Sequence, residues 1–158
     1  MKHLQVATIA TILVFGAAVS FPAYAASSDD PSRFIYTRIY CTPEGVTHFK
    51  DVTVELSKND IAPPAAPVYI GGKLPASVAC FGGFEPVWGS RDLENRLNHP
   101  GPAALFATIL RGKFSITTTD GDKRQFSPGD MVRVEDNAPC KGHITVAGDK
   151  AGFLMFAR

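Results

Sequence analysis

Turn-forming residues divide this sequence into short segments, and that division limits the folds the chain can adopt. The chain has 14 glycines and 12 prolines. Between them lie runs rich in β-branched and aromatic residues, such as Phe34 to Tyr40 and Lys113 to Thr119. No segment after residue 25 repeats its apolar residues with a sustained helical period. Short strands separated by turns are typical of β-sandwiches and β-barrels, so we predict an all-β fold.

The clearest local prediction is an N-terminal β-hairpin. Phe34 to Tyr40 is strand-like, Thr42-Pro43-Glu44-Gly45 has turn chemistry, and the residues from Val46 to Leu56 alternate in character. A proline-rich connector then runs from Asp60 to Pro75. Further strands are predicted at Val68 to Ile70, Ser77 to Phe81, Ala103 to Leu110, Lys113 to Thr119, Met131 to Val134, His143 to Val146 and Gly152 to Phe156.

The first 25 residues have the organisation of a secretory signal. A short basic start is followed by an uncharged run from Val6 to Ser20 and by Ala23-Tyr24-Ala25, where small residues suit a signal peptidase. The alternative is a permanent membrane anchor, but this run is shorter than the roughly 20 residues that span a bilayer. We therefore predict a signal peptide over 1–25, a flexible tail over 26–32 and one domain over 33–158. The mature protein would be periplasmic or secreted, with no membrane association after cleavage.

Charge argues against one class of partner. The chain has 16 basic and 15 acidic side chains, and the signal segment holds one basic residue, Lys2, and no acidic one. The mature chain is therefore balanced, and it contains no basic run. Nucleic-acid-binding domains usually carry a basic patch or stripe, so we predict no nucleic-acid partner.

Three cysteines allow a single disulfide. Cys41, Cys80 and Cys140 can pair in three ways, and export would place them where a disulfide persists. We favour Cys80–Cys140, because Cys41 lies at the tip of the predicted hairpin. Three free thiols are the alternative. The sequence has no Cys-x-x-Cys, so it suggests neither a redox pair nor a zinc knuckle.

The second half of the chain resembles the cupins, and more narrowly a group of small bacterial cupins. The order and spacing of several short motifs carry the resemblance. It implies a cupin-type double-stranded β-helix, that is, a jelly-roll barrel with an N-terminal β-hairpin, in which 33–158 form a single cupin domain. The motifs are Phe106 to Phe114, Asp120-Gly121, Phe126-x-Pro128-Gly129-Asp130, Trp88, His99-Pro100, Glu135-Asp136 and Lys141-Gly142-His143.

The resemblance also implies a degenerate metal-binding motif. Metal-binding cupins use His-x-His, a following Glu and a later His. With Gly112 as the glycine that closes the first motif, the first three positions fall on His99, Gly101 and Leu105. The fourth falls on His143, or on Cys140 if the loop is aligned without an insertion. Gly101 and Leu105 cannot coordinate, and Glu135 is a candidate third ligand. A divalent transition metal on His99 and His143 is therefore the candidate cofactor.

The candidate ligand pocket consists of Trp88, His99, Glu135 and His143 near the barrel mouth. His143 also has a structural interpretation, in which its ring bonds to Glu135 or Asp136. For Trp88 two interpretations stay open: an aromatic wall together with Phe81 and Phe84, or a lid over one end of the barrel.

Three hypotheses of function follow. The first is an exported cupin-domain protein that binds a small organic ligand in its barrel. The second is a metal-dependent enzyme, a dioxygenase or isomerase, that uses His99, His143 and Glu135. The third is a non-catalytic partner-binding module. In each case a homodimer is expected, with the N-terminal hairpin as the pairing element.

Overall fold

The computed structural model describes residues 29–74, 76–90 and 98–158, and over these ranges the chain consists of strands and connecting loops without a helix. The all-β prediction is confirmed. The predicted signal peptide lies outside the described residues. No helix in the described part of the chain is long and apolar enough to cross a membrane.

Eleven strands are present in the described ranges, and most of them coincide with predicted runs. Two were not among the predicted runs, the polar β3 and the short β8. The strands are β1 (Arg33–Cys41), β2 (Thr47–Glu55), β3 (Ser57–Asn59), β4 (Val68–Ile70), β5 (Ala79–Phe84), β6 (Leu105–Arg111), β7 (Phe114–Thr118), β8 (Lys123–Phe126), β9 (Met131–Glu135), β10 (His143–Ala147) and β11 (Gly152–Ala157).

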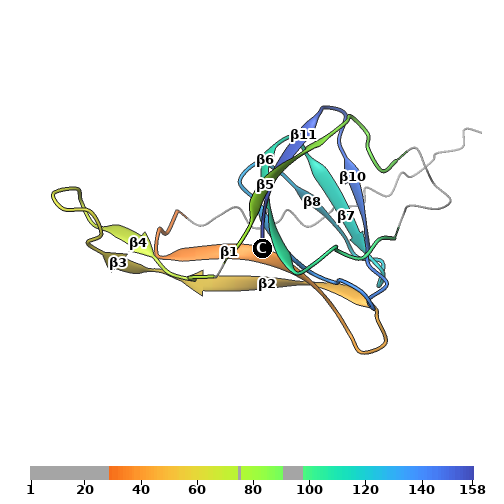
Figure 1. Ribbon diagram of the computed structural model, residues 1–158, viewed down its shortest axis with the longest axis horizontal. Coiled ribbons are helices and arrows are strands. Elements are labelled where there is room, and N and C mark those ends of the chain that lie inside the picture. Colours follow the sequence, from red (N-terminus) through yellow and green to blue (C-terminus); the bar gives the residue numbers. More distant parts are fainter. Residues whose placement is uncertain (1–28, 75, 91–97) are drawn as a thin grey trace, which may run out of the picture.

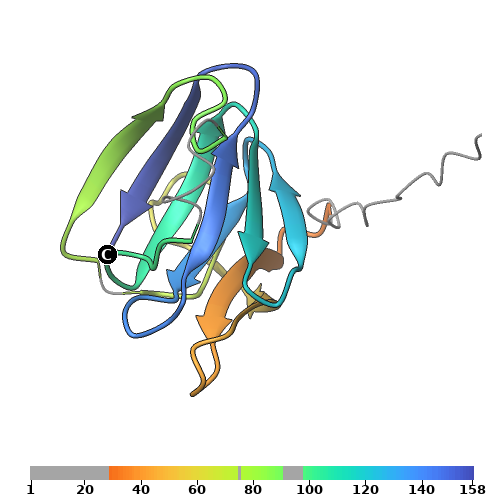
Figure 2. The same cartoon turned by 90° about the vertical axis from the view of Figure 1, so that its right-hand side faces the viewer.

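Two sheets face each other across one core, as Figure 2 shows from the side. The larger sheet has six strands in the order β2-β1-β9-β6-β11-β5, and the smaller has the order β10-β7-β8. β6 illustrates why the sheets pack in this way. Its alternate residues Leu105, Ala107 and Ile109 are buried in the core, whereas Leu110 is 47% exposed.

Three of the most deeply buried apolar side chains of the core come from β1, β8 and β9. Ile39, Phe126 and Val132 are at most 1% exposed, and Phe49 packs against Phe126 with ring centroids 6.2 Å apart. Burying such side chains contributes roughly 1.5–3 kcal/mol each, so this region provides much of the stability of the fold.

The predicted N-terminal hairpin is confirmed. β1 and β2 pair antiparallel along their whole length, from Arg33 opposite Glu55 to Cys41 opposite Thr47. β1 also pairs in parallel with β9, which joins the hairpin to the second half of the chain. β2 is left at the edge of the six-stranded sheet.

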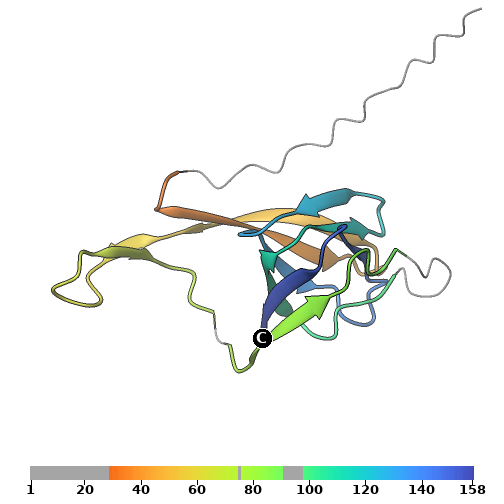
Figure 3. The same cartoon turned by 90° about the horizontal axis from the view of Figure 1, so that it is seen from above.

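A two-stranded ribbon of β3 and β4 projects from the end of the hairpin away from the sandwich (Figures 1 and 3). We call it the arm and define it as residues 57–70. Its strands have three residues each, and Ile61, Val68 and Tyr69 are exposed. A ribbon of this size is at most marginally stable alone.

The predicted Cys80–Cys140 disulfide is wrong. Cys41 bonds to Cys140 with a Cα–Cα distance of 6.0 Å, and Cys80 is a free, exposed thiol on β5. The hairpin tip is not isolated as the sequence suggested. The parallel pairing of β1 with β9 continues to Tyr40 and Glu135, so Cys41 meets the loop that follows β9.

Candidate functional site

A cavity of about 440 Å³ lies between the two sheets. Its walls are the inward side chains of β6, β9 and β11 from the large sheet and of β7 and β10 from the small one. Small-molecule pockets usually measure roughly 300–1,000 Å³, so its size suits an organic ligand. Most of the lining is apolar. The polar side chains among the lining residues are Cys80, His99, His143, Thr145 and Arg158.

One wall of the cavity is aromatic. Phe84 contacts Trp88 edge to face with centroids 5.0 Å apart, and it contacts Phe114 in the same way at 5.3 Å. Trp88 is 41% exposed and follows Val87, whose φ of 56° is rare for a β-branched residue. Trp88 lines the cavity together with Phe84, as the aromatic-wall interpretation predicted, whereas its interpretation as a lid stays a prediction.

The structure brings His99 and His143 together. Their backbones form an isolated antiparallel bridge, in which each N–H donates to the other residue's carbonyl at 3.0 and 3.1 Å. Their ring centroids lie 4.8 Å apart. Gly142 makes this approach possible, because a Cβ at that position would lie 2.2 Å from the carbonyl carbon of His99. The convergence expected from the sequence is therefore present.

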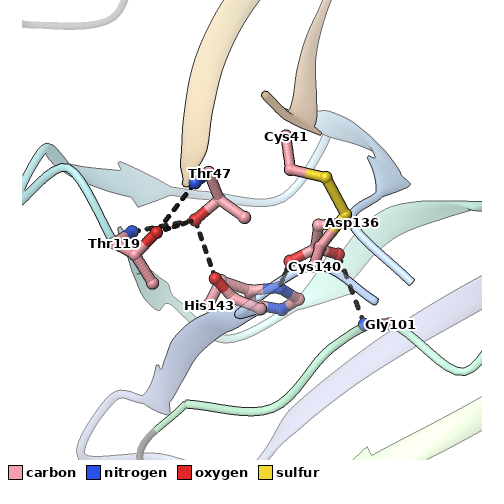
Figure 4. Close-up of a disulfide and its surroundings, with 8 residues drawn as sticks. Cys41, Thr47, Gly101, Thr119, Asp136, Cys140 and His143 are labelled. Atoms are coloured by element: carbon pink, nitrogen blue, oxygen red, sulfur yellow. Dashed lines mark hydrogen bonds and ion pairs between the residues drawn. A yellow bond between two sulfur atoms is a disulfide. The ribbon is translucent and has the colours of Figure 1, made fainter. Parts of the chain in front are cut away.

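Asp136 is a third polar side chain at the two histidines, and it bonds to His143. Its Oδ2 lies 2.6 Å from Nδ1 of His143, and its Oδ1 accepts a hydrogen bond from the Gly101 N–H at 3.3 Å. The Asp136 side chain is fully buried and that of His143 is 6% exposed (Figure 4). An ionised carboxylate can only accept hydrogen bonds, so Nδ1 of His143 carries the hydrogen.

Two contacts attach the loop from Asp136 to His143 to the N-terminal hairpin. The Cys41–Cys140 disulfide ties it to β1. The hydroxyl of Thr47 donates to the carbonyl of Gly142 at 2.7 Å, and Thr47 exchanges further hydrogen bonds with Thr119. Figure 4 shows these attachments around His143. The orientation of the histidine is thus fixed by β2 as well as by its own strand.

His99 stays neutral more readily than an ordinary histidine. Burial lowers the pKa of His99, and the neighbouring His143 lowers it further, whereas a hydrogen bond to the Pro100 backbone and the charge of Asp136 act in the opposite direction. Its Nε2 is buried and has no hydrogen-bond partner in the described part of the chain. His99 therefore offers the site an imidazole with one uncommitted nitrogen.

Glu135 does not join the predicted pocket. It follows Val132 and Val134, which face inward, and lies on the opposite face of β9. Burial alone would raise the pKa of its carboxyl, but hydrogen bonds and charge from Arg133 and Arg38 lower it. Glu135 therefore binds these two arginines on the outer face of the sheet. The carboxylate that bonds to His143 is that of Asp136, the neighbour of Glu135 and one of the two partners that the sequence allowed for His143.

The donors present do not fit a first-row metal centre. His99 and His143 are suitable ligands, but Gly101 and Leu105 hold the other cupin positions and Glu135 faces away. No three His, Cys, Asp or Glu side chains in the described ranges converge in a way that could hold a metal ion. Transition metals in proteins usually take three or four such ligands.

Two residues at β5 differ in their relation to the cavity. Phe81 was a candidate for the aromatic wall, but it is 77% exposed and does not line the cavity. Cys80, which the sequence assigned to a disulfide, lines it. Alternate residues of a strand point to opposite faces, so one residue of register separates the two.

A second hollow of about 540 Å³ lies on the outer face of the large sheet, where the chain returns from the arm. Tyr36 and Phe106 stack edge to face there with centroids 5.3 Å apart, and the Arg133 guanidinium lies 4.6 Å from the centre of the Phe106 ring. The hollow is also lined by Tyr69 of the arm. No sequence pattern indicated this hollow, because its lining comes from six separate segments.

No protein-family model, curated protein or solved structure matches the chain.

Proposed function

We propose that this chain is an exported cupin-domain protein that binds a small organic ligand in the interior of its barrel. The observation that carries the proposal is the cavity of about 440 Å³, apolar on most sides, with His99 and His143 in its wall. Apolar cavities with a few fixed polar groups are the usual form of small-molecule sites. The Cys41–Cys140 disulfide is compatible with an oxidising compartment outside the cytoplasm.

A cavity-filling substitution tests the proposal. Ala107 is 6% exposed and lines the cavity, so Ala107→Leu would place three further carbons inside it. Its neighbour Thr108 faces the outer hollow instead, and Thr108→Leu is the matched control on the same strand. The probe is the neutral fluorophore N-phenyl-1-naphthylamine, whose emission rises in apolar surroundings.

The dye should bind the wild type and the control, and Ala107→Leu should weaken its binding at least about tenfold. Circular dichroism checks that both variants are folded. Equal dye binding by Ala107→Leu and the wild type would place the dye elsewhere and contradict the proposal. A second readout uses Cys80, the free thiol at the cavity, because bulky maleimide modification there should also block the dye.

The alternative is a metal-dependent cupin enzyme, a dioxygenase or isomerase, and the approach of His99 to His143 is what favours it. It ranks second because Glu135 would first have to leave Arg38 and Arg133. Elemental analysis of protein purified without chelators tests it. One equivalent of metal that is lost in both His99→Ala and His143→Ala would support the enzyme. Substoichiometric metal that neither variant changes would reject it.

We also propose that the protein is a homodimer, which a partner-binding role would share. Apolar side chains stand exposed on the arm and on the outer face of the large sheet, among them Tyr69, Phe81 and Phe153. β2 adds an open strand edge in the N-terminal hairpin. Sedimentation equilibrium should give twice the monomer mass, and Val52→Lys on β2 should lower it. A wild type that remains monomeric at high concentration would contradict the dimer.

A further inference from the structure

The polar groups of the cavity restrict the chemistry of its ligand. The first restriction comes from His143. Its Nδ1–H is committed to the Asp136 carboxylate at 2.6 Å, and Asp136 is fully buried, so this bond is shielded from water. A neutral imidazole has one donor and one acceptor nitrogen. In the neutral form of the ring, the nitrogen that His143 has left for a ligand, Nε2, is therefore an acceptor.

His99 reaches the same state by a different route. The proline at position 100 has no N–H, so the hydrogen bond between the His99 ring and the Pro100 backbone has the carbonyl as acceptor. Nε2 of His99 has no partner among the described residues, which leaves Nδ1 as the donor in that bond. Nε2 is then a buried acceptor without a hydrogen. A buried acceptor without a donor is unfavourable, and a ligand donor placed against it would relieve this cost.

Charge supplies the second restriction. Among the described residues that line the cavity, Arg158 is the one lysine or arginine, and it is exposed. No other lysine or arginine in this described lining offers a carboxylate or phosphate the positive partner that burial requires. An anionic ligand would also bring its own acceptors against two imidazole acceptors. The hydrogen-bond pattern and the charge both disfavour anions.

The aromatic wall supplies the third restriction. Phe84, Trp88 and Phe114 contact one another edge to face, and their ring systems line the same cavity. A flat aromatic ligand can extend this arrangement with further offset or edge contacts. Such a ligand needs its polar group at one end, where the two histidines lie.

We propose that the cavity prefers an uncharged aromatic molecule bearing a hydroxyl group, and that this hydroxyl donates a hydrogen bond to Nε2 of His99 or His143. The inference rests on the proposed function and adds the class of ligand to it. The Asp136–His143 pair sets the donor requirement, and His99 reinforces it. Asp136 acts through His143 and is a positioning residue.

Four naphthalene derivatives separate the parts of this proposal, with affinity measured by titration calorimetry on the intact protein. 2-Naphthol has a donor, 2-methoxynaphthalene has an acceptor only, naphthalene has neither, and 2-naphthoate is an anion. The wild type should bind 2-naphthol about tenfold more tightly than the ether or the hydrocarbon, the factor that one net hydrogen bond supplies. It should bind 2-naphthoate most weakly.

Two variants test the roles of the residues. His99→Phe keeps the ring volume and the backbone bridge but removes the acceptor, so the preference for 2-naphthol over naphthalene should fall several-fold while naphthalene still binds. Asp136→Asn keeps an oxygen for the Gly101 N–H, but its amide donates to Nδ1 of His143. Nε2 of His143 must then carry the hydrogen. The affinity for 2-methoxynaphthalene should therefore rise relative to the affinity for 2-naphthol.

The outcomes distinguish this inference from the proposed function. If naphthalene binds as tightly as 2-naphthol and Ala107→Leu blocks both, the cavity is a ligand site but the hydroxyl preference is wrong. If 2-naphthoate binds best, the site recognises charge and the inference is overturned. If no aromatic compound binds the wild type, the proposed function fails together with the inference. An unchanged order of affinities in Asp136→Asn would contradict the role of Asp136.

Discussion

Two histidine–aspartate pairs in this molecule have the same geometry and different surroundings. Nδ1 of His143 lies 2.6 Å from Oδ2 of Asp136, and Nδ1 of His48 lies 2.6 Å from Oδ2 of Asp120. The side chains of the first pair are 6% and 0% exposed, and those of the second are 31% and 26% exposed. Distance alone therefore does not separate the site from the surface.

Burial changes what each pair can do. Around Asp120, burial would raise the pKa of the carboxyl, but hydrogen bonds from the Thr118 hydroxyl, the Asp122 N–H and His48 lower it. Water can replace any of these partners if one is lost. Asp136 is buried, so water reaches it less easily than it reaches Asp120. The loss of one partner of Asp136 therefore leaves another polar group unsatisfied. The buried pair should therefore contribute far more to stability and to the cavity's chemistry.

The largest expected effect is on the buried pair. Asp136→Ala leaves Nδ1 of His143 and the Gly101 N–H without an acceptor, and we expect the free energy of unfolding to fall by about 2–5 kcal/mol. Urea titration followed by circular dichroism measures it. Asp136→Asn is the control and should lose much less, because the amide keeps both bonds. A loss for Asp136→Ala no larger than that for His48→Ala would break the contrast between the pairs.

Removing the disulfide is a second way to test the contrast between the buried and the exposed pair, because Cys140 lies in the loop that follows Asp136. The bond joins residues 99 positions apart, and removing it with Cys41→Ser and Cys140→Ser should cost about 2–4 kcal/mol. Cys80→Ser, at the free and exposed thiol, should change stability by less than about 0.5 kcal/mol. Denaturant titration compares the three proteins.

Nuclear magnetic resonance can follow the two pairs separately in the disulfide variant. The ring signals of His143 should shift or broaden, since its loop has lost an anchor. Those of His48 should change less, because the hydrogen bonds between β1 and β2 still hold it opposite Tyr40. Equal changes at both rings would show that the disulfide does not act on the buried pair in particular.

Most of the strands were predictable because they bury alternate residues and end at turns. Gly121 illustrates the turn signal, since the β7–β8 connection needs its φ of 91° and the sequence places glycine there. β3 was missed because Ser57–Asn59 is polar and exposed throughout, so it carries no alternation. The finer prediction of a cupin jelly roll stays a prediction beyond the all-β fold.

The site was predictable in part, and one signal went unused. His99 and His143 converge, which their motifs suggested. Val132 and Val134 are buried on one face of β9, and the same period of two carries Asp136 inward and Glu135 outward. This alternation could have chosen Asp136 as the pocket carboxylate. The disulfide had no such signal, because chain separation carries no information about the parallel pairing of β1 with β9.

The pH dependence of stability should identify His99 at the buried site. Its folded pKa lies below the ordinary value of 6.5, so the unfolded chain takes up the proton first as the pH falls. This histidine therefore makes stability decrease as the pH falls from about 7.5 through 6.5 towards the folded pKa. The slope from one group is at most about 1.4 kcal/mol per pH unit.

His99→Gln should remove that part of the slope, whereas His48→Gln should retain it. Unfolding free energies measured by urea titration across the pH range give the difference between each variant and the wild type. Other titrating groups contribute equally to both curves and cancel, provided that the substitution does not move His143 or Asp136. A slope that is the same in His99→Gln and the wild type would mean that burial does not hold His99 neutral.

The smallest expected effect is on the exposed pair. A double-mutant cycle with His48→Ala and Asp120→Ala isolates its coupling energy, which single substitutions would overstate because Asp120 also binds Thr118 and the Asp122 N–H. Partly exposed pairs couple by about 0.2–1 kcal/mol, and added salt should weaken this value. A matching cycle on Asp136 and His143 should give a larger coupling that salt hardly changes. If the two couplings prove equal, the common distance of 2.6 Å, and not burial, determines the strength of both pairs.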